Sequence, residues 1–178
     1  MLEILVPAKE FYDEDKNEFS YSKATKLTLE HSLISLSKWE SKWKKPFLSS
    51  DKTIEETIDY IRCMTLTQNV PPEVYRSLSS ENLQDVVAYI EDPMTATTIS
   101  GKKKTVKGET VTAELIYYWM VTLNIPFECQ KWHLNKLITL VEVCSIKNQP
   151  QKKMSKADIL RQNRELNAAR RAKHKTRG

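Results

Sequence analysis

Cysteine and histidine are the residue types in this sequence best suited to bind a metal ion or to supply a nucleophile and a base. Cys129 and His133 are four positions apart, so on a helix they would share one face. A structural zinc site needs four ligands and usually contains two cysteines separated by two to four residues, a pattern that this sequence lacks. We therefore interpret Cys129 and His133 as packing residues, and we expect neither a metal nor another cofactor.

The three cysteines, Cys63, Cys129 and Cys144, stand at unrelated spacings, and their odd number argues against a disulfide framework. This usage is typical of a reducing compartment. No signature of a cysteine nucleophile surrounds them, and the histidines lie in different predicted elements. With only 3 glycines, the chain also lacks a glycine-rich phosphate loop. We predict that the protein is not an enzyme.

Trp39 and Trp43 lie in a lysine-rich segment that ends with Lys44 and Lys45. Aromatic rings interleaved with basic residues could stack on bases and contact phosphates. Tryptophans at helical spacing are more often core or interface residues, with the lysines as their solvated flank. The pattern therefore favours packing, and as a functional surface it favours a protein interface over nucleic acid.

Basic residues are concentrated at the C-terminal end of the chain. Residues 147–178 contain 11 Lys and Arg against 2 Asp and Glu, a net charge of +9, whereas residues 1–146 contain 17 and 21, a net charge of −4. Such blocks of charge usually form interaction tails. This tail could bind phosphate backbones, dock on an acidic protein surface such as that of a neighbouring copy, or serve only as a solubilising terminus.

A capping pattern that starts at Ser155 predicts a helix in this tail, to about Arg171. Its large apolar residues are only Ile159, Leu160 and Leu166, too few to hold it strongly against a core. Arginines mixed with Ala and Asn at helical spacing favour a helix laid on a partner over a plain polycation. The candidate partner-binding residues of the whole chain are Trp39, Trp43, Lys44, Lys45, Trp132, Arg161, Arg164, Arg170, Arg171 and Lys173.

Alternating apolar and polar residues predict β-structure at two places. Leu2–Val6 and Tyr21–Glu30 predict an N-terminal β-hairpin, with an acidic loop over Phe11–Phe19 between its strands. β-forming residues on both sides of Ser100–Lys104 predict a small second hairpin over Met94–Val111.

Helical periodicity dominates the remaining sequence. Apolar stripes, caps and prolines predict helices over residues 31–45, 54–64, 72–78, between Ser80 and Pro93, over 112–124 and over 128–147. The last two are expected to pair as an antiparallel helix hairpin at the centre of the core. The predicted fold class is mainly α: a helical bundle with the two β-hairpins and a basic C-terminal helix. The predicted domains are a single helical domain over residues 1–146 and a linker with a basic tail over 147–178.

No segment of the sequence has the character of a membrane span. The longest apolar run, Leu115–Val121, is far shorter than the roughly 20 residues that cross a bilayer as a helix. Met1–Pro7 is apolar but contains Glu3 and lacks a basic start, which argues against a signal peptide. We expect a soluble protein that is made in a cytoplasm and stays there.

Three segments, Ile34–Leu48, Leu115–Leu137 and Leu166–Arg171, resemble a family of small proteins from tailed bacteriophages. The resemblance extends over nearly the whole chain, including Met94–Thr98 and Thr176–Gly178. The family is similar to tail assembly chaperones or neighbouring tail morphogenesis proteins, which are mainly helical and encoded near the tape-measure protein. The resemblance implies that the chain binds the helical tape-measure protein in the host cell cytoplasm. It brings no catalytic motif, so it implies no catalytic residue.

Two other functions stay open at this point. The protein could remain in the particle as a structural component of the tail, neck or baseplate, or it could be a nucleic-acid-binding accessory protein that uses the basic tail. The acidic body and the lack of a recognised reading motif count against the second. The expected partners are other phage proteins (the tape measure, the tail tube or neighbouring virion subunits) and further copies of the chain, with nucleic acid less favoured and no membrane.

Overall fold

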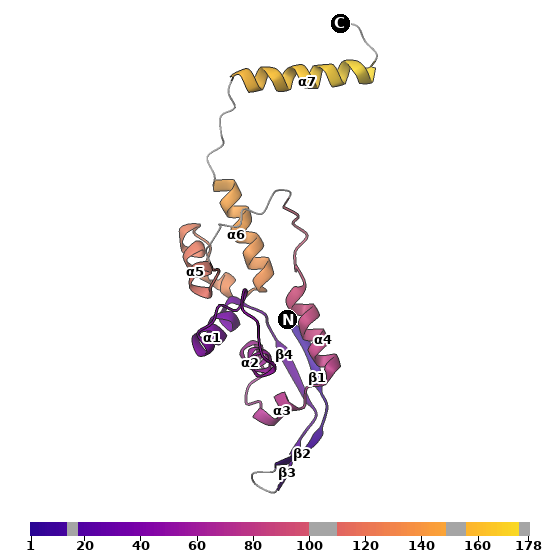
Figure 1. Ribbon diagram of the computed structural model, residues 1–178, viewed down its shortest axis with the longest axis vertical. Helices are drawn as coiled ribbons and strands as arrows, with labels where there is room; N and C mark the ends of the chain where they lie inside the picture. Colours follow the sequence, from indigo (N-terminus) through magenta and orange to yellow (C-terminus); the bar gives the residue numbers. More distant parts are fainter. Residues whose placement is uncertain (14–17, 100–109, 149–155, 175–178) are drawn as a thin grey trace. The chain divides into compact units, whose positions relative to one another are not determined.

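The computed structural model describes the chain except for residues 14–17, 100–109, 149–155 and 175–178 (Figure 1). The chain divides into two units, Met1–Lys147 and Asn148–Gly178. This division falls one residue beyond the boundary drawn from the charge distribution. Each unit is described by itself below.

The described residues are mostly helical, with two antiparallel sheets of two strands each, which confirms the predicted class of mainly helical fold with an N-terminal β-hairpin. The elements of the first unit are β1 (Leu2–Val6), β2 (Lys9–Asp13), β3 (Glu18–Ser22), β4 (Thr25–Leu29), α1 (Leu33–Trp43), α2 (Ile54–Met64), α3 (Pro72–Arg76), α4 (Ser80–Glu91), α5 (Ala113–Thr122), the 3-10 helix η1 (Phe127–Lys131) and α6 (Leu134–Asn148).

The two sheets are successive parts of one N-terminal ribbon. β1 pairs with β4, from Leu2 opposite Leu29 to Val6 opposite Thr25, and β2 pairs with β3, from Lys9 opposite Ser22 outwards. The first pair confirms the predicted hairpin. The predicted loop over Phe11–Phe19 is wrong in part, because its two ends are strands. The acidic composition suggested a loop, but the ladder started by β1 and β4 resumes past Pro7, and aromatic residues are good β-formers.

The pair β1–β4 has one buried and one exposed face. Ile4, Val6, Leu27 and Leu29 are buried, whereas Leu5, between two of them, is exposed. This alternation is the one expected of a strand pair with a single face on the core. It fixes the register, since a shift by one residue would expose all four apolar side chains.

Serine and threonine side chains cap the starts of α1 and α2. Ser32 and Ser35 form a capping box at the start of α1, and Thr53 and Glu56 form the predicted one at the start of α2. Lys44 follows the last residue of α1, and its backbone adopts the left-handed conformation with φ of 54°. This conformation turns the chain back, so that the following segment lies over α1.

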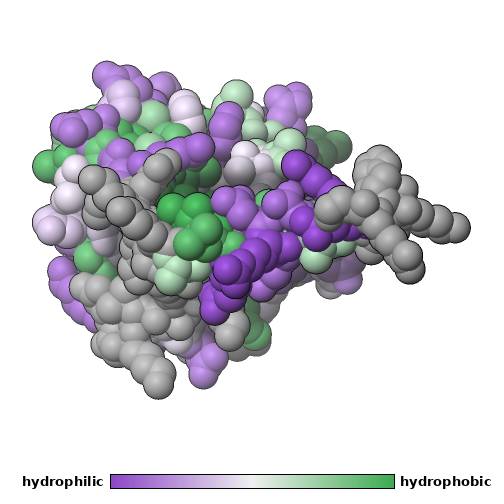
Figure 2. All heavy atoms as spheres, turned by 90° about the horizontal axis from the view of Figure 1, so that it is seen from above, coloured by the Kyte–Doolittle hydropathy of each residue, from purple (hydrophilic) through white to green (hydrophobic). Residues whose placement is uncertain are grey.

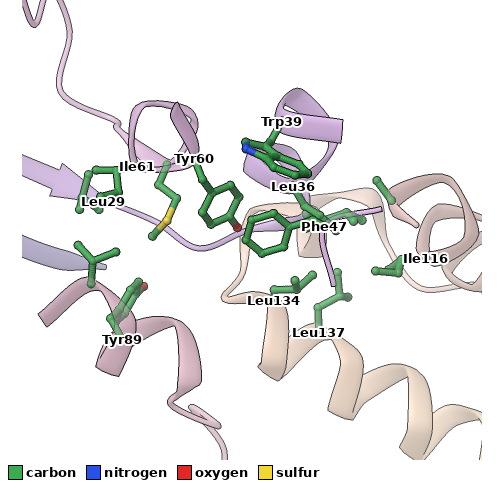
Figure 3. Packing of buried hydrophobic residues seen from close by; sticks show 14 of the residues in the cluster. Leu29, Leu36, Trp39, Phe47, Tyr60, Ile61, Tyr89, Ile116, Leu134 and Leu137 are labelled. Atoms are coloured by element: carbon green, nitrogen blue, oxygen red, sulfur yellow. The ribbon is translucent and has the colours of Figure 1, made fainter. Parts of the chain in front are cut away.

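The core lies around α1, which packs against α2, α5 and η1. Trp39, Phe47 and Tyr60 form an aromatic cluster, with ring centroids 5.1 Å apart for Trp39 and Phe47 and 3.9 Å apart for Phe47 and Tyr60. Figure 3 shows the Phe47 and Tyr60 rings side by side, near Leu36 of α1 and Leu134 of α6. α1 therefore holds the central place that we predicted for the pair of helices after residue 112.

A buried carboxylate of α1 binds two segments that lie far apart in the sequence. Glu40 accepts hydrogen bonds from the backbone N–H of Phe47, at 2.7 Å, and from that of Ala113, also at 2.7 Å. Each bond goes to a different carboxylate oxygen. The side chain is 7% exposed, so these bonds replace the water that an ionised carboxylate would otherwise require. Glu40 thereby joins the turn after α1 to the first residue of α5.

Two further predictions need correction. The helix predicted to begin at Glu128 begins at Leu134, because the chain after Pro126 forms η1 and then extends through Trp132. The second β-hairpin is not seen where the structure describes its segment: residues 94–99 and 110–111 form no strand. Threonine-rich composition alone gives this segment β-propensity but no partner to pair with. The rest of that prediction, residues 100–109, lies outside the described residues.

The second unit contains one helix, α7 (Lys156–His174). It ends three residues beyond the predicted end, and its predicted cap, Ser155, lies outside the described residues. Every side chain of α7 whose burial is described is exposed. The helix therefore has no core of its own.

Candidate functional site

Trp39, the first of the candidate partner-binding residues, belongs to the core. Its side chain is 0% exposed, and its indole N–H donates to the backbone carbonyl oxygen of Glu56 at 2.8 Å. The Trp39 side chain is therefore not accessible to a partner in the folded protein. The physical reason is that α2 supplies both the apolar surface and the hydrogen-bond acceptor that this indole needs.

The neighbouring residues use their polar groups in the same contact between α1 and α2. The Trp43 indole N–H donates to the Asp59 carboxylate at 2.9 Å, and Lys42 donates to the same carboxylate at 2.6 Å. Lys45 donates to the Glu56 carboxylate at 2.5 Å. Hydrogen bonds from Lys45 and from the backbone of Thr53 lower the pKa of Glu56. The tryptophan–lysine segment is thus built to hold α1 on α2.

Three candidates of the first unit have exposed side chains. Lys44 follows the end of α1, Lys45 is exposed although it bonds the Glu56 carboxylate, and Trp132 is 39% exposed beside η1. The Lys136 ammonium group lies 4.7 Å from the centre of the Trp132 ring, a cation–π contact. Because Trp39 is buried, none of these residues forms a stacking platform with it.

The remaining candidates lie in the second unit, on α7: Arg161, Arg164, Arg170, Arg171 and Lys173. All five side chains are exposed. Residues 156–174 carry six basic and two acidic residues, so the helix has a net charge of +4 with histidine neutral. The exposed positive charge of the candidate set is therefore concentrated on α7.

Large exposed hydrophobic side chains occur over several elements of the chain. On the face shown in Figure 2, hydrophobic residues form separate groups with hydrophilic residues between them. Single exposed apolar residues are normal on protein surfaces, and only contiguous groups indicate binding. One contiguous group, on the N-terminal ribbon, is analysed below.

A buried histidine pair is the feature that sequence reasoning missed. His31 precedes Ser32, the residue that caps α1, and His133 immediately precedes α6; their ring centroids are 5.0 Å apart in an edge-to-face arrangement. The backbone N–H of Leu134 donates to the carbonyl oxygen of His31 at 2.7 Å. No periodic signal links these two histidines, because each lies outside a helix and their contact arises only when the chain folds.

Burial favours the neutral form of His133. Its Nε2 lies 3.0 Å from the carbonyl oxygen of Tyr89, which requires Nε2 to carry the proton, and its Nδ1 accepts from the backbone N–H of Asn135 at 3.3 Å. A second proton on Nδ1 would face that N–H. Burial lowers the pKa of His133, against the opposing effects of the Tyr89 carbonyl, Glu30 and Asp92.

His31 is neutral for the same reason. Its Nδ1 lies 2.5 Å from the Tyr60 hydroxyl, and burial, followed by the proximity of His133, lowers the pKa of His31 to about 3. Burial also raises the pKa of Tyr60, so that its hydroxyl stays protonated and can donate to His31. Both imidazoles therefore act as fixed polar links in the core.

The described part of the chain offers no cluster of three or more His, Cys, Asp or Glu residues suited to a metal ion. Burial raises the pKa of the thiols of Cys63 and Cys129, which keeps them protonated near neutral pH. Cys129 lies in η1 and His133 beyond its end, so they do not share a helix face as predicted from their spacing.

Comparison with known proteins adds no relative to this picture: no family model, no curated protein and no solved structure matches the chain. Among the described helices, none combines the length and apolar character needed to span a bilayer. The class defined by the fold is a mainly helical protein with an N-terminal β-ribbon and a separate, exposed basic helix.

Proposed function

We propose that the protein is a non-enzymatic tail morphogenesis protein of a bacteriophage, and that it acts as an assembly chaperone that binds the helical tape-measure protein. Two arguments support this function. The first is the sequence resemblance to small phage tail proteins. The second, which carries the proposal, is that α7 is a long basic helix whose described side chains are all exposed.

An exposed helix such as α7 lacks the packing that stabilises most helices in proteins. An isolated helix shorter than about 15 residues is marginal in water, and one of 19 residues gains most of its stability from packing. α7 has three large apolar residues, and they are exposed. A helix with this composition is suited to gain its packing from another molecule.

The same features fit a reversible contact with a long helical partner. A few apolar side chains, flanked by arginine, provide weak binding that depends partly on charge. Binding of this kind keeps an aggregation-prone helix apart from its neighbours and is displaced when the tail tube polymerises around it. Several copies of the chain would bind along one tape-measure protein.

Co-expression with the tape-measure protein tests this function. The chain should co-purify with it and increase its soluble fraction, and mass spectrometry of purified particles should find the tape measure but not this chain. A fixed copy number in the particle would instead show a structural component of the virion. If the chain neither co-purifies nor changes the soluble fraction, the chaperone function is wrong.

Charge reversal locates the contact. Arg164→Glu, Arg170→Glu and Arg171→Glu together should abolish co-purification with the tape measure. The matched control reverses three exposed basic residues of the first unit, Lys23, Arg76 and Lys131, and should retain it. Equal binding by both triple variants would remove α7 from the proposal.

Nucleic-acid binding is the second candidate, because the +4 charge of α7 is exposed. Binding through phosphates weakens steeply with salt, by roughly a decade or more for a few-fold rise in concentration when several phosphates are contacted. A gel shift with duplex DNA at two salt concentrations measures this. A tight, salt-sensitive shift that the triple arginine variant loses would favour this function over the chaperone.

A further inference from the structure

The outer part of the N-terminal ribbon stands away from the helical core. Figure 1 shows β2 and β3 continuing beyond β1 and β4, past α3. The contact with α3 is made by Ser22, which is buried and whose hydroxyl lies 2.5 Å from that of Ser77. We call the rest of the β2–β3 pair the outer hairpin.

One face of the outer hairpin carries three aromatic side chains. Glu10 pairs with Tyr21 and Tyr12 pairs with Phe19, and because directly opposite residues share a face, all four lie on the same side. Ser22 belongs to the opposite side, which faces α3. Phe19 is 77% exposed and Tyr21 is 61% exposed, while the Tyr12 and Phe19 rings contact each other at 5.1 Å between centroids. We call these four residues the aromatic face.

The outer hairpin is acidic. Its described residues include Glu10 on the aromatic face and Asp13 and Glu18, which form the last pair of the ladder, against one basic residue, Lys9. The described strands therefore carry a net charge of −2. An exposed aromatic surface that includes Glu10, on a hairpin of net negative charge, is suited to a basic helix with an apolar stripe.

α7 has such a stripe. Ile159 and Leu166 are seven positions apart and share one side of the helix, next to Leu160, and all three are exposed. Arg170 and Arg171 continue this side towards the C-terminal end. From Ile159 to Arg171 the helix spans about 18 Å, comparable to the roughly 13 Å of a five-residue strand. Apolar residues and arginines thus follow one another along the helix.

We propose that the aromatic face of the outer hairpin in one copy of the chain binds α7 of a second copy. Ile159, Leu160 and Leu166 pack on the aromatic rings, and the arginines of α7 lie by the acidic end of the hairpin. Reciprocal binding uses both surfaces of both copies and closes a two-fold dimer. This contact is between copies of the chain and does not depend on the proposed role in a phage tail.

Charge selects this pairing among those that copies of the chain could make. Two outer hairpins, each at −2, repel each other, and so do two α7 helices, each at +4. Only hairpin with helix brings opposite charges together and buries apolar surface on both sides. Because the surfaces are small, we expect association in the micromolar range and an association constant that falls with salt.

Sedimentation velocity of the full chain, at about 1 to about 100 µM, measures the dimer over the range expected of a small interface. Phe19→Ser together with Tyr21→Ser should weaken it about tenfold or more, the usual loss for a central aromatic contact. The matched control is Phe127→Ser, since Phe127 is an exposed aromatic residue of η1 outside the hairpin. Equal dimerisation by wild type and the double variant, or a wild type that stays monomeric over this range, overturns the proposal.

A charge exchange separates binding between copies from binding within one copy. Glu10→Lys with Glu18→Lys makes the hairpin basic, and Arg164→Glu with Arg170→Glu and Arg171→Glu makes α7 acidic. Each variant alone should be monomeric, with a first unit that unfolds in urea as that of the wild type does. An equimolar mixture should dimerise, since every contact between the two variants joins opposite charges. A mixture that stays monomeric contradicts the proposal, and it does so whether or not the chain binds a tape-measure protein.

Discussion

The contact between α1 and α2 and the helix α7 look alike in sequence and differ completely in structure. Both combine large apolar residues with closely spaced basic residues. At the first, Trp39 is buried, and Lys42 and Lys45 bind the carboxylates of Asp59 and Glu56. On α7 the described side chains are exposed.

The two segments differ in burial because only the Trp39–Lys45 segment faces a complementary helix within its own unit. α2 presents carboxylates and a backbone carbonyl at the spacing that the Trp39–Lys45 segment needs, so the polar groups of that segment are satisfied inside the unit. α7 has no such complement in its own unit, which contains no second helix among its described residues. Basic and apolar residues on one helix therefore indicate an interaction, and only the rest of the fold tells whether that interaction is internal.

Replacement of Trp39 should give the largest effect. Trp39→Ala removes a fully buried indole and takes the indole N–H donor away from the backbone carbonyl oxygen of Glu56. The free energy of unfolding should therefore fall by about 3 to 5 kcal/mol. The matched change on α7, Leu166→Ala, should alter it by less than about 0.5 kcal/mol. Urea unfolding followed by tryptophan fluorescence and circular dichroism measures both. Similar losses at the two sites would show that α7 is part of the core.

Glu40 should come next. In Glu40→Ala the backbone N–H groups of Phe47 and Ala113 lose their buried acceptor, at a cost of about 3 kcal/mol for two unmet donors. Glu40→Gln keeps one oxygen acceptor and should lose less. Urea unfolding of the two variants gives the order. If alanine and glutamine are equally tolerated, the carboxylate does not hold the two segments to α1.

Acid should weaken the first unit through His31. The unfolded chain protonates this imidazole below about pH 6.5, whereas in the folded protein its pKa is about 3, so the unfolded state binds more protons between these values. The free energy of unfolding should therefore fall as the pH falls through this window, by about 1.4 kcal/mol per pH unit from this residue.

Urea unfolding between about pH 7 and about pH 5 avoids most carboxylate titration and isolates this slope. His31→Gln retains an acceptor for the Tyr60 hydroxyl but does not titrate, so its slope should be shallower, with His133 as the residual contributor. An unchanged slope in this variant would mean that His31 is protonated in the folded state.

Local patterns predicted most of the helices of this fold. The capping box at Thr53 and Glu56 and the prolines that end helices depend on residues close in sequence, and these features proved accurate. The apolar stripe predicted for α2 from Ile54 to Met64 was accurate at Ile61 and Met64 but not at Ile54, which is 81% exposed. The pairing of β1 with β4 was also predictable, because Ile4 and Val6 alternate with exposed residues as Leu27 and Leu29 do. Such signals need no knowledge of the rest of the chain.

Contacts between distant segments were not predictable from the sequence. The burial of Trp39 depends on Glu56, the role of Glu40 depends on Ala113, and the approach of His31 to His133 depends on α6. None of these pairs produces a periodic pattern in the sequence. The strand character of β2 and β3 was hidden by acidic residues, which are typical of loops but tolerated on an exposed hairpin. For the same reason, the aromatic face was found only through the register of that hairpin.

The smallest expected effect on stability is at the arginines of α7. Arg164→Ala, Arg170→Ala and Arg171→Ala together should change the free energy of unfolding of the first unit by less than about 0.5 kcal/mol, because exposed side chains outside a core contribute little. The same triple variant should lose binding wherever α7 is the contact. Urea unfolding and sedimentation velocity on one preparation measure the two effects together. Loss of stability together with loss of association would show that α7 supports its own chain, and that the two basic segments serve the same purpose after all.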